Sequence, residues 1–380
     1  MDYNIKAEDG VINKGNLYRL KKCMKKALNG GPVITAFLGG SITQGSLASD
    51  SEKCYAYLVY KWWKKKFPAA DVSFINAGVG GTTSQYGVAR VEDHVLRYRP
   101  DFVLTEFAVN DKNDEFFKET YEGLIRRIYK DPCNPAMLLM NNVQYDDGKS
   151  AEQMHLAVAK AYEIPMVSMK ETIYPLVVSG EIMRRDITPD DLHPNDRGHE
   201  LVAHVIISFL ESVYDDLGRD EEPSYFDNGE LPAPITANEY EYSQRYQNRN
   251  SDAILEGFIK DPHEQRDVTD TFSGGWTADK TGDKISLNIK GSGIAVQYRR
   301  SVSRPVSVAR VTVDGDEGSS MLLDGSFDED WGDCLYMDTV LKHGSNKEHR
   351  VEIEIVSTHE DDKVPFYLVS VIGSMGKEAE

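Results

Sequence analysis

Residues 33–43 read Val-Ile-Thr-Ala-Phe-Leu-Gly-Gly-Ser-Ile-Thr, and this passage gives the clearest indication of the fold. Residues 33–38 form a nearly unbroken apolar run, which is typical of a strand buried on both faces of a sheet. Gly39 and Gly40 follow and allow the chain to turn tightly. Ser41 is then expected just beyond the carboxyl end of the strand. Its hydroxyl attacks other groups only when a base takes its proton, so Gly-Gly-Ser alone is also the pattern of an ordinary structural turn.

The same kind of apolar run recurs along the first part of the chain, and segments with helical spacing separate the runs. The further runs are residues 72–75, 102–104, 136–140 and 165–167. The helical segments are residues 55–67, 85–98, 115–129, 151–162 and 198–214. Such alternation predicts an α/β domain, with a parallel sheet covered by helices. Ligands on such sheets bind at the carboxyl ends of the strands.

The last part of the chain has a different texture. Residues 218–250 are rich in proline and glutamate and predict a semi-ordered linker. Short runs with period-two alternation follow, separated by Gly-rich turns, and they predict an antiparallel β-sandwich. The runs are residues 285–289, 294–298, 306–313, 335–340, 351–356 and 366–372. We therefore expect a catalytic domain at 1–217, a linker at 218–250 and a β-sandwich at 251–376.

Composition excludes several classes of partner. The 380 residues include 43 basic and 62 acidic side chains, so the formal net charge is -19, and most of the excess lies after residue 220. Nucleic acids and anionic membranes carry charge of the same sign, so neither is an expected partner. No apolar run reaches the roughly 20 residues of a membrane-spanning helix, and residues 1–5 show no secretory pattern.

Four scattered cysteines, without a CxxC pair, argue against a zinc site and against a disulfide scaffold. We expect a cytoplasmic protein that keeps its thiols reduced, with no metal and no cofactor.

Two more polar blocks follow predicted strands. Residues 76–83, Asn-Ala-Gly-Val-Gly-Gly-Thr-Thr, can direct a backbone N–H into a site; they also suit a phosphate-cradling loop, although no P-loop lysine completes that pattern. Residues 108–111, Ala-Val-Asn-Asp, offer the Asn110 amide as a donor at the same edge, or a helix N-cap.

The fourth block is Asp190-Asp191-Leu192-His193-Pro194, just before the last predicted helix. Asp190 and His193 are close enough in one loop for the carboxylate to bond Nδ1, which leaves Nε2 free to take a proton from a serine. Asp191 is an alternative partner, although the spacing favours Asp190. His199 and His204 fall on the helix, where packing or surface positions are expected.

Taken in order, the four blocks resemble the SGNH (GDSL-type) hydrolase family over residues 30–215. The resemblance implies a flavodoxin-like three-layer α/β/α domain, followed here by a jelly-roll-like β-sandwich. It also implies that Ser41 is the nucleophile, His193 the general base and acid, and Asp190 the residue that orients His193. By the same resemblance, the oxyanion hole is formed by the N–H groups of Ser41 and Gly81 and by the Asn110 side chain.

The sequence departs from this family's usual pattern twice. Gly40 stands where the first block usually has Asp, and Val109 stands where the third block usually has Gly. Neither position supplies a catalytic atom, so the chemistry is expected to survive. The ordinary lipase-like branch becomes a poorer match.

The two-domain layout is similar to bacterial mannan O-acetyl esterases that carry a C-terminal carbohydrate-binding-like module. That resemblance implies a serine carbohydrate esterase that removes O-acetyl groups, the mannose 2-O-acetyl in particular, from manno-oligosaccharides. One alternative is an acetyl esterase acting on another acylated glycan, such as xylan, or on a small acyl ester. Another is a glycan-binding protein whose hydrolase domain is inactive.

Residues 324–333 of the second domain form a predicted loop that contains Trp331 among several acidic side chains. An exposed Trp ring stacks well on a sugar, so we predict that Trp331 helps to hold the glycan over Ser41. The alternative is a ring that covers its own sandwich core. The acidic residues are expected to be a solvated turn rather than a calcium site, because they lack the EF-hand spacing.

Overall fold

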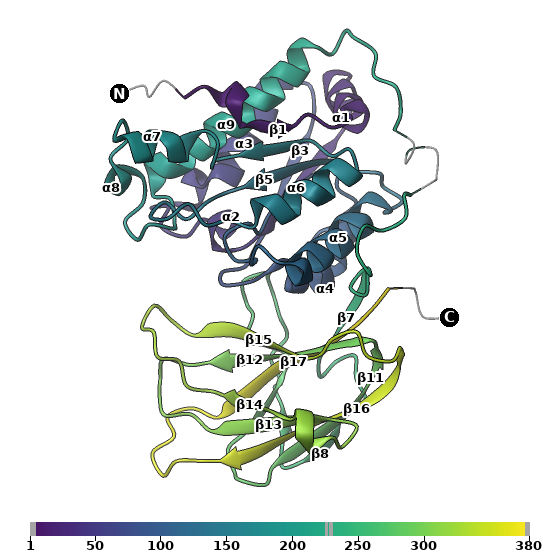
Figure 1. Ribbon diagram of the computed structural model, residues 1–380, viewed down its shortest axis with the longest axis vertical. Helices are drawn as coiled ribbons and strands as arrows, with labels where there is room; N and C mark the ends of the chain where they lie inside the picture. Colours follow the sequence, from purple (N-terminus) through teal and green to yellow (C-terminus); the bar gives the residue numbers. More distant parts are fainter. Residues whose placement is uncertain (1–4, 225–226, 228–230, 377–380) are drawn as a thin grey trace. The chain divides into compact units, whose positions relative to one another are not determined.

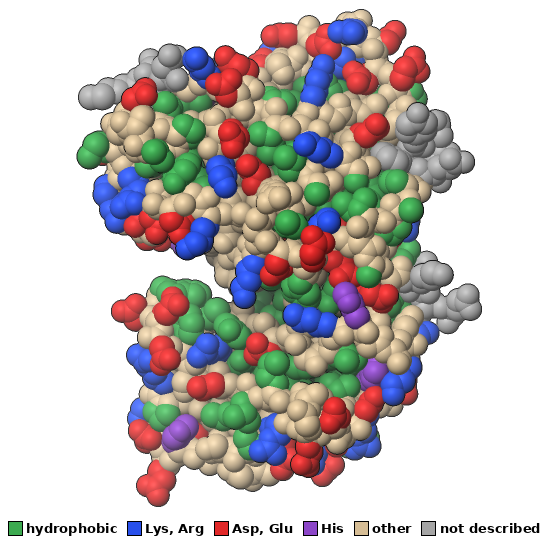
Figure 2. Space-filling model, viewed as in Figure 1, with side chains coloured by type: hydrophobic (Ala, Val, Ile, Leu, Met, Phe, Trp, Pro, Cys, Tyr) green, Lys and Arg blue, Asp and Glu red, His purple; other side chains and the backbone are tan. Residues whose placement is uncertain are grey.

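The computed structural model describes residues 5–224, 227 and 231–376 of the chain. Contacts between Cα atoms divide it into two compact units, residues 1–238 and 239–380. Figure 1 shows an α/β first unit and an all-β second unit, and Figure 2 shows acidic and basic side chains interspersed over the visible face of each. Among the described residues, none of the helices combines the length and apolar character needed to cross a membrane.

The first unit is built on a six-stranded sheet with the order β1-β6-β5-β4-β2-β3. Its strands are β1 (Val11–Asn13), β2 (Val33–Gly39), β3 (Val72–Gly78), β4 (Phe102–Glu106), β5 (Ala136–Asn141) and β6 (Met166–Ser168). β2 to β6 are parallel, as predicted, and their order is that of the flavodoxin-like fold. The strand order reverses beside β2, so a crevice is expected at the carboxyl ends of β2 and β4.

β1 was not predicted, and it makes the sheet mixed because it pairs antiparallel with β6. A strand of three residues is too short to show a period-two pattern, so only its pairing with β6 defines it.

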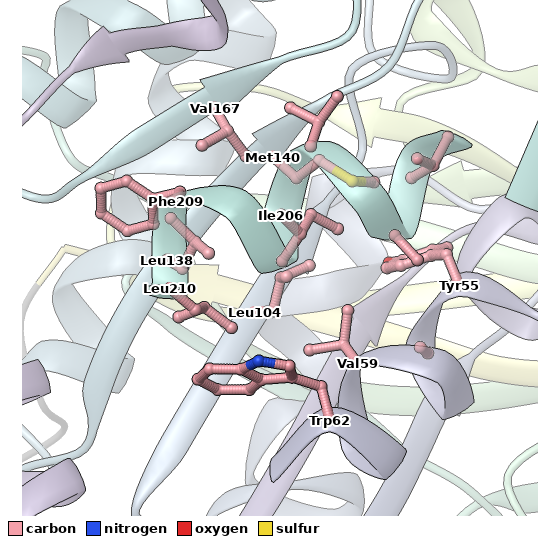
Figure 3. Packing of buried hydrophobic residues seen from close by; sticks show 14 of the residues in the cluster. Tyr55, Val59, Trp62, Leu104, Leu138, Met140, Val167, Ile206, Phe209 and Leu210 are labelled. Carbon is pink, nitrogen blue, oxygen red and sulfur yellow. The ribbon is translucent and has the colours of Figure 1, made fainter. Parts of the chain in front are cut away.

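Helices cover both faces of this sheet (Figure 1). They are α1 (Tyr18–Leu28), α2 (Ser41–Gln44), α3 (Tyr55–Lys66), α4 (Ser84–His94), α5 (Glu115–Tyr129), α6 (Glu152–Ala161), α7 (Ile173–Ser179), α8 (Arg184–Ile187) and α9 (Asp196–Asp215). One apolar core joins α1, α3 and α9 to the sheet; in Figure 3, Trp62 of α3 and Ile206 of α9 lie near Leu104 of β4. Helices α4, α5 and α6 cover the other face.

The start of α9 fixes the fourth sequence block. The side chain of Asn195 caps the helix by accepting a hydrogen bond from the Gly198 N–H at 3.1 Å. Asn195 Nδ2 also donates to the Asp186 carbonyl at 3.0 Å, which ties the cap to α8. The segment that carries His193 is therefore held at the point where it enters the helix.

The second unit consists of two antiparallel sheets that share one core. The first sheet has the order β15-β12-β17-β10-β9, with β7 also paired to β17, and the second has the order β14-β13-β16-β11-β8. The strands are β7 (Tyr242–Tyr246), β8 (Ile254–Glu256), β9 (Ile259–Lys260), β10 (Trp276–Ala278), β11 (Lys284–Gly291), β12 (Gly293–Arg300), β13 (Val308–Val313), β14 (Met321–Asp324), β15 (Cys334–Leu341), β16 (Lys347–Ser357) and β17 (Phe366–Met375). This is the predicted antiparallel β domain.

The segment predicted as a linker, residues 218–250, is more ordered than its composition suggests. Strand β7 lies within it and pairs with β17 of the second unit. Earlier in the same segment, the N–H groups of Ile235 and Thr236 donate to the buried carboxylate of Glu122 in the first unit, at 2.8 and 2.9 Å. Tertiary hydrogen bonds thus order a stretch whose proline content indicates an extended chain.

Candidate active site

Ser41 lies at the carboxyl edge of the sheet, where β2 ends and α2 begins. Only 7% of its surface is exposed. As the first residue of a helix, Ser41 has no intrahelical acceptor for its N–H. The serine therefore offers both a hydroxyl and a backbone donor at the same place.

The hydroxyl faces His193, which comes from the loop before α9. His193 Nε2 lies 2.8 Å from Ser41 Oγ, and His193 Nδ1 lies 2.6 Å from Asp190 Oδ2. The other carboxylate oxygen of Asp190 accepts the N–H of His193 at 2.7 Å and of Leu192 at 3.1 Å. The three residues that the sequence singled out are thus connected by hydrogen bonds in the order Asp190, His193, Ser41.

These bonds also set the charge of Asp190. Partial burial opposes its ionisation, but the hydrogen bonds from the His193 ring and from the two backbone N–H groups outweigh that effect and lower the pKa of the carboxyl. Asp190 is therefore a carboxylate at neutral pH and accepts a proton-bearing Nδ1, which leaves the lone pair of Nε2 directed at the serine.

Asp191, the alternative partner, has a different environment. Its carboxylate forms ion pairs with Arg184 Nε at 2.8 Å and with Arg185 Nη1 at 2.9 Å. Its backbone has a φ of 71°, and its carbonyl accepts the N–H of Tyr145 at 2.7 Å. The structure thus places Asp190 against His193, whereas Asp191 helps to hold the loop in place.

The three predicted oxyanion donors belong to loops at this same edge. Gly81 has a left-handed φ of 69°, a conformation that favours glycine, and its N–H has no acceptor among the described residues. The neighbouring Gly80 N–H is already occupied, since it donates to Gln44 Oε1 at 2.7 Å. Asn110 follows β4, and its side chain makes no hydrogen bond within the described part of the chain.

The two departures from the family pattern have physical explanations here. A Cβ atom at Gly40 would lie 2.7 Å from Asn110 Oδ1, so a larger residue there would displace the Asn110 side chain where the loops after β2 and β4 approach each other. Val109 packs its partly buried side chain against the apolar core of the first unit. Gly40 therefore lies in the site itself, whereas Val109 packs against the core.

A cavity of about 590 Å³ adjoins Asn110 in the first unit. Its walls come from the turn after β4, the loop between β5 and α6, and Lys170; their polar members include Lys112, Asn113, Gln144, Lys149 and Ser150. These side chains can form directional hydrogen bonds with a ligand that carries several hydroxyl groups.

Sequence reasoning missed three polar residues around the site. Gln44 holds the loop after β3, as described above. Glu106 is fully buried at the end of β4, and burial raises the pKa of its carboxyl to about 8. His155 is fully buried on α6 and bonds to Asp111. His155, Val158, Ala159 and Tyr162 have the spacing of one helix face, which was a readable signal that His155 points inward.

Trp331 lies in the second unit, in the loop between β14 and β15, and 59% of its surface is exposed. Its ring packs edge-on against Phe327 with centroids 5.1 Å apart, and its Nε1 donates to Glu329. The ring is therefore held by neighbours in its own loop while one face stays accessible. Within the described residues, no group of three or more His, Cys, Asp or Glu side chains could hold a metal ion.

A flavodoxin-like sheet with a hydrogen-bonded Asp–His–Ser array at its carboxyl edge defines an α/β serine hydrolase. The model of the GDSL-like lipase/acylhydrolase family matches residues 37–201, so the first unit contains a domain of that family. Over 186 residues the chain is 28% identical to the thioesterase 1/protease 1/lysophospholipase L1 of Escherichia coli K12, and the match covers 46% of this chain and 82% of that protein.

Two solved structures match along the whole chain. One is a two-domain esterase active on acetylated mannans, co-crystallised with mannopentaose; it is 54% identical, with a TM-score of 0.94, and the match covers 100% of both chains. The other is a two-domain esterase with the same stated activity; it is 55% identical, with a TM-score of 0.95, and the match covers 99% of this chain and 100% of that one.

Proposed function

We propose that this protein is a serine carbohydrate esterase that removes O-acetyl groups, the mannose 2-O-acetyl in particular, from manno-oligosaccharides. The observation that carries the ester chemistry is the hydrogen-bonded array of Asp190, His193 and Ser41. The observation that favours acetylated mannan is the full-length similarity to two esterases active on that polymer.

The first half of the reaction makes an acyl-enzyme. Ser41 Oγ attacks the acetyl carbonyl while His193 Nε2 takes the hydroxyl proton, and Asp190 stabilises the resulting imidazolium. Negative charge develops on the carbonyl oxygen, where the N–H groups of Ser41 and Gly81 and the Asn110 amide donate hydrogen bonds. Loss of one such donor typically lowers the rate by about 10²–10³.

The first half ends when His193 gives its proton to the departing sugar oxygen, which leaves an acetyl-serine and a free hydroxyl on the glycan. The second half releases acetate. Water then takes the place of the sugar, and His193 removes its proton as it attacks the acetyl carbonyl. The same three donors meet the second oxyanion. When this adduct collapses, the bond between Ser41 Oγ and the acetyl carbon breaks, His193 returns the proton to Ser41 Oγ, and acetate leaves.

The cavity beside Asn110 supports a carbohydrate over a lipid substrate. Amide, hydroxyl and ammonium groups line it, and such groups make the directional hydrogen bonds that sugar hydroxyls need. We propose that it receives part of the sugar that carries the ester. Replacing Gln144 by Ala would then raise KM for acetylated oligosaccharide and leave KM for a small synthetic acetyl ester unchanged.

The test of function is NMR of a multiply acetylated manno-oligosaccharide during digestion. The 2-O-acetyl signal should disappear first, and acetate should appear at the same rate. Ser41→Ala should lower the rate of acetate release by several orders of magnitude while the fold is retained, because the nucleophile is lost. Persistence of the 2-O-acetyl signal while other acetyl groups disappear would contradict the assigned position.

Two alternatives predict different outcomes. Faster acetate release from acetylated xylan or from synthetic esters than from mannan would favour another acyl ester as substrate. Glycan binding without acetate release from any of these compounds would favour an inactive hydrolase domain. A serine-directed phosphonate gives a rapid answer, since it labels Ser41 only if His193 activates the hydroxyl.

Trp331 is proposed as a glycan-stacking residue, with the second unit acting as a carbohydrate-binding module. The observation that favours this role is that the Trp331 ring is exposed and packs edge-on against Phe327. Trp331→Ala should lower activity on acetylated oligosaccharide and spare activity on a small synthetic ester. Unchanged activity on the oligosaccharide would show that the idea is wrong.

A cytoplasmic location is proposed from the thiols. All four cysteines are free, and three of them are buried, as expected in a compartment that keeps thiols reduced. Cell fractionation with an antibody against the protein tests this location directly.

A further inference from the structure

Directly after Asn110, the chain enters a buried polar cluster that the reaction does not use. The side chains of Asp111 and His155 are both fully buried, and His155 Nε2 lies 3.0 Å from Asp111 Oδ2. The other oxygen, Asp111 Oδ1, accepts the N–H of Ser84 at 2.9 Å. Ser84 begins α4 and His155 lies in α6, so one carboxylate joins the turn after β4 to two helices.

His155 is itself held on several sides. The ring of Tyr121 from α5 stacks on the imidazole, with centroids 3.6 Å apart and planes 12° from parallel. His155 Nδ1 lies 3.3 Å from Asn141 Oδ1 at the end of β5. A ring held by a stacked aromatic group and by partners on both nitrogens has no free rotamer, so it fixes the position of the Asp111 carboxylate.

The backbone of the turn is held as well. The carbonyl of Ala108 accepts the N–H of Ala151 at 2.8 Å, and the N–H of Asp111 donates to the Phe107 carbonyl at 2.9 Å. Asn110 lies between these two anchored residues. Its own side chain has no hydrogen bond within the described residues, so only its backbone and the wall at Gly40 direct the amide.

We propose that Asp111 and His155 are positioning residues that aim the Asn110 amide at the oxyanion. The inference rests on the proposed function, because it needs a reaction in which negative charge develops beside Asn110. An oxyanion donor acts mainly in the transition state, so a misaimed amide lowers kcat far more than it changes KM.

The experiment measures kcat and KM with 4-nitrophenyl acetate, a small ester that needs no glycan contact. His155→Leu removes the donor to Asp111 and should lower kcat by about 10- to 100-fold, with KM changed less than about threefold. His155→Gln can present an amide N–H where Nε2 stood and should recover most of kcat. His204→Leu, the same substitution at an exposed histidine of α9, is the control and should match the unmodified protein.

A double-mutant cycle separates positioning from general damage to the fold. If His155 acts through Asn110, then His155→Leu should cost little further activity in a protein that already carries Asn110→Ala, because the donor is absent. Two effects that multiply would overturn the inference. So would a folded His155→Leu protein with unchanged kcat.

Asp111→Asn covers the case in which His155→Leu does not fold. It is nearly isosteric, keeps an acceptor for Ser84 and weakens only the bond to His155, so it should lower kcat by about 10-fold. Unchanged kcat in this folded variant overturns the inference. Lack of activity in the unmodified protein on every acetyl ester would instead contradict the proposed function.

Discussion

At the scale of single residues, the site includes a close approach that a larger side chain would disturb. Gly40 and Asn110 come from loops after neighbouring strands, and a Cβ on Gly40 would lie 2.7 Å from the Asn110 oxygen. The two adjacent aspartates have different partners. Asp190 bonds to His193, and Asp191 forms ion pairs with two arginines.

Gly40→Ala should displace the Asn110 amide and lower kcat on 4-nitrophenyl acetate by about 10- to 100-fold, since an oxyanion donor is moved. The matched control is Gly218→Ala, because an added Cβ there meets no atom within 4 Å. Equal kcat in the two variants would show that Asn110 tolerates the contact or does not act as a donor.

Asp190→Asn should lower kcat by about 10³–10⁴, because an amide in place of the carboxylate neither stabilises the imidazolium nor fixes the productive tautomer. Asp191→Asn should stay within about threefold of the unmodified protein, since the Asp191 carboxylate pairs with two arginines and not with His193. Steady-state kinetics on both folded variants decide which carboxylate serves His193; a larger loss at Asp191 would reverse the assignment.

At the scale of elements, β4 ends in a buried acid immediately before the turn that carries Asn110. Glu106 is fully buried, and the backbone N–H groups of Ala108 and Val109 lower the pKa of its carboxyl less than burial raises it. Burial raises its pKa to about 8, from an ordinary value of 4.5. The folded protein therefore retains a proton at Glu106 at neutral pH that the unfolded chain has lost.

This difference gives stability a pH dependence of known sign. Between about pH 4.5 and 8 the folded state binds the extra proton, so the contribution of Glu106 to stability falls as pH rises through that window. The side chain of the Glu106→Gln variant cannot ionise. The melting temperature of this variant, relative to that of the unmodified protein, should therefore increase as pH rises from 5 to 8. A difference in melting temperature that does not change with pH would mean that Glu106 is ionised in the folded protein.

At the scale of the whole molecule, the C-terminal boundary of the first unit is set by contacts that residues 231–238 make with the rest of that unit. Glu122 is buried and accepts hydrogen bonds from Ile235, Thr236 and Tyr162. Nearby, Arg126 Nη1 donates to the Pro232 carbonyl at 2.9 Å. A buried carboxylate that loses its partners is strongly destabilising.

A protein truncated after residue 238 should therefore melt at a clearly higher temperature than one truncated after residue 217. Both retain the four sequence blocks, so the comparison isolates the added segment. Glu122→Gln in the longer protein is a useful companion, since it removes the charge but keeps an acceptor. Equal melting temperatures for the two lengths would show that residues 218–238 do not stabilise the first unit.

Much of the fold could be predicted because its signals are local. Apolar runs such as residues 33–38 and 102–104 identify buried strands wherever they occur, and residues 115–129 show helical spacing that the structure reproduces as α5. β1 lacked such a signal, as did the ordered part of the segment after residue 218. Each depends on hydrogen bonds to partners far away along the chain.

Local patterns in the sequence indicated the alternating α/β layout, the antiparallel second unit and the four blocks that carry Ser41, Gly81, Asn110 and the Asp190–His193 pair. The packed structure was needed to show that Asp190 contacts His193 while Asp191 pairs with arginines, that Gly40 lies against Asn110, and that His155 contacts the turn beside Asn110. Strands and helices follow from the periodicity of neighbouring residues, whereas contacts between loops depend on where the packed sheet and its helices place side chains far apart in the chain.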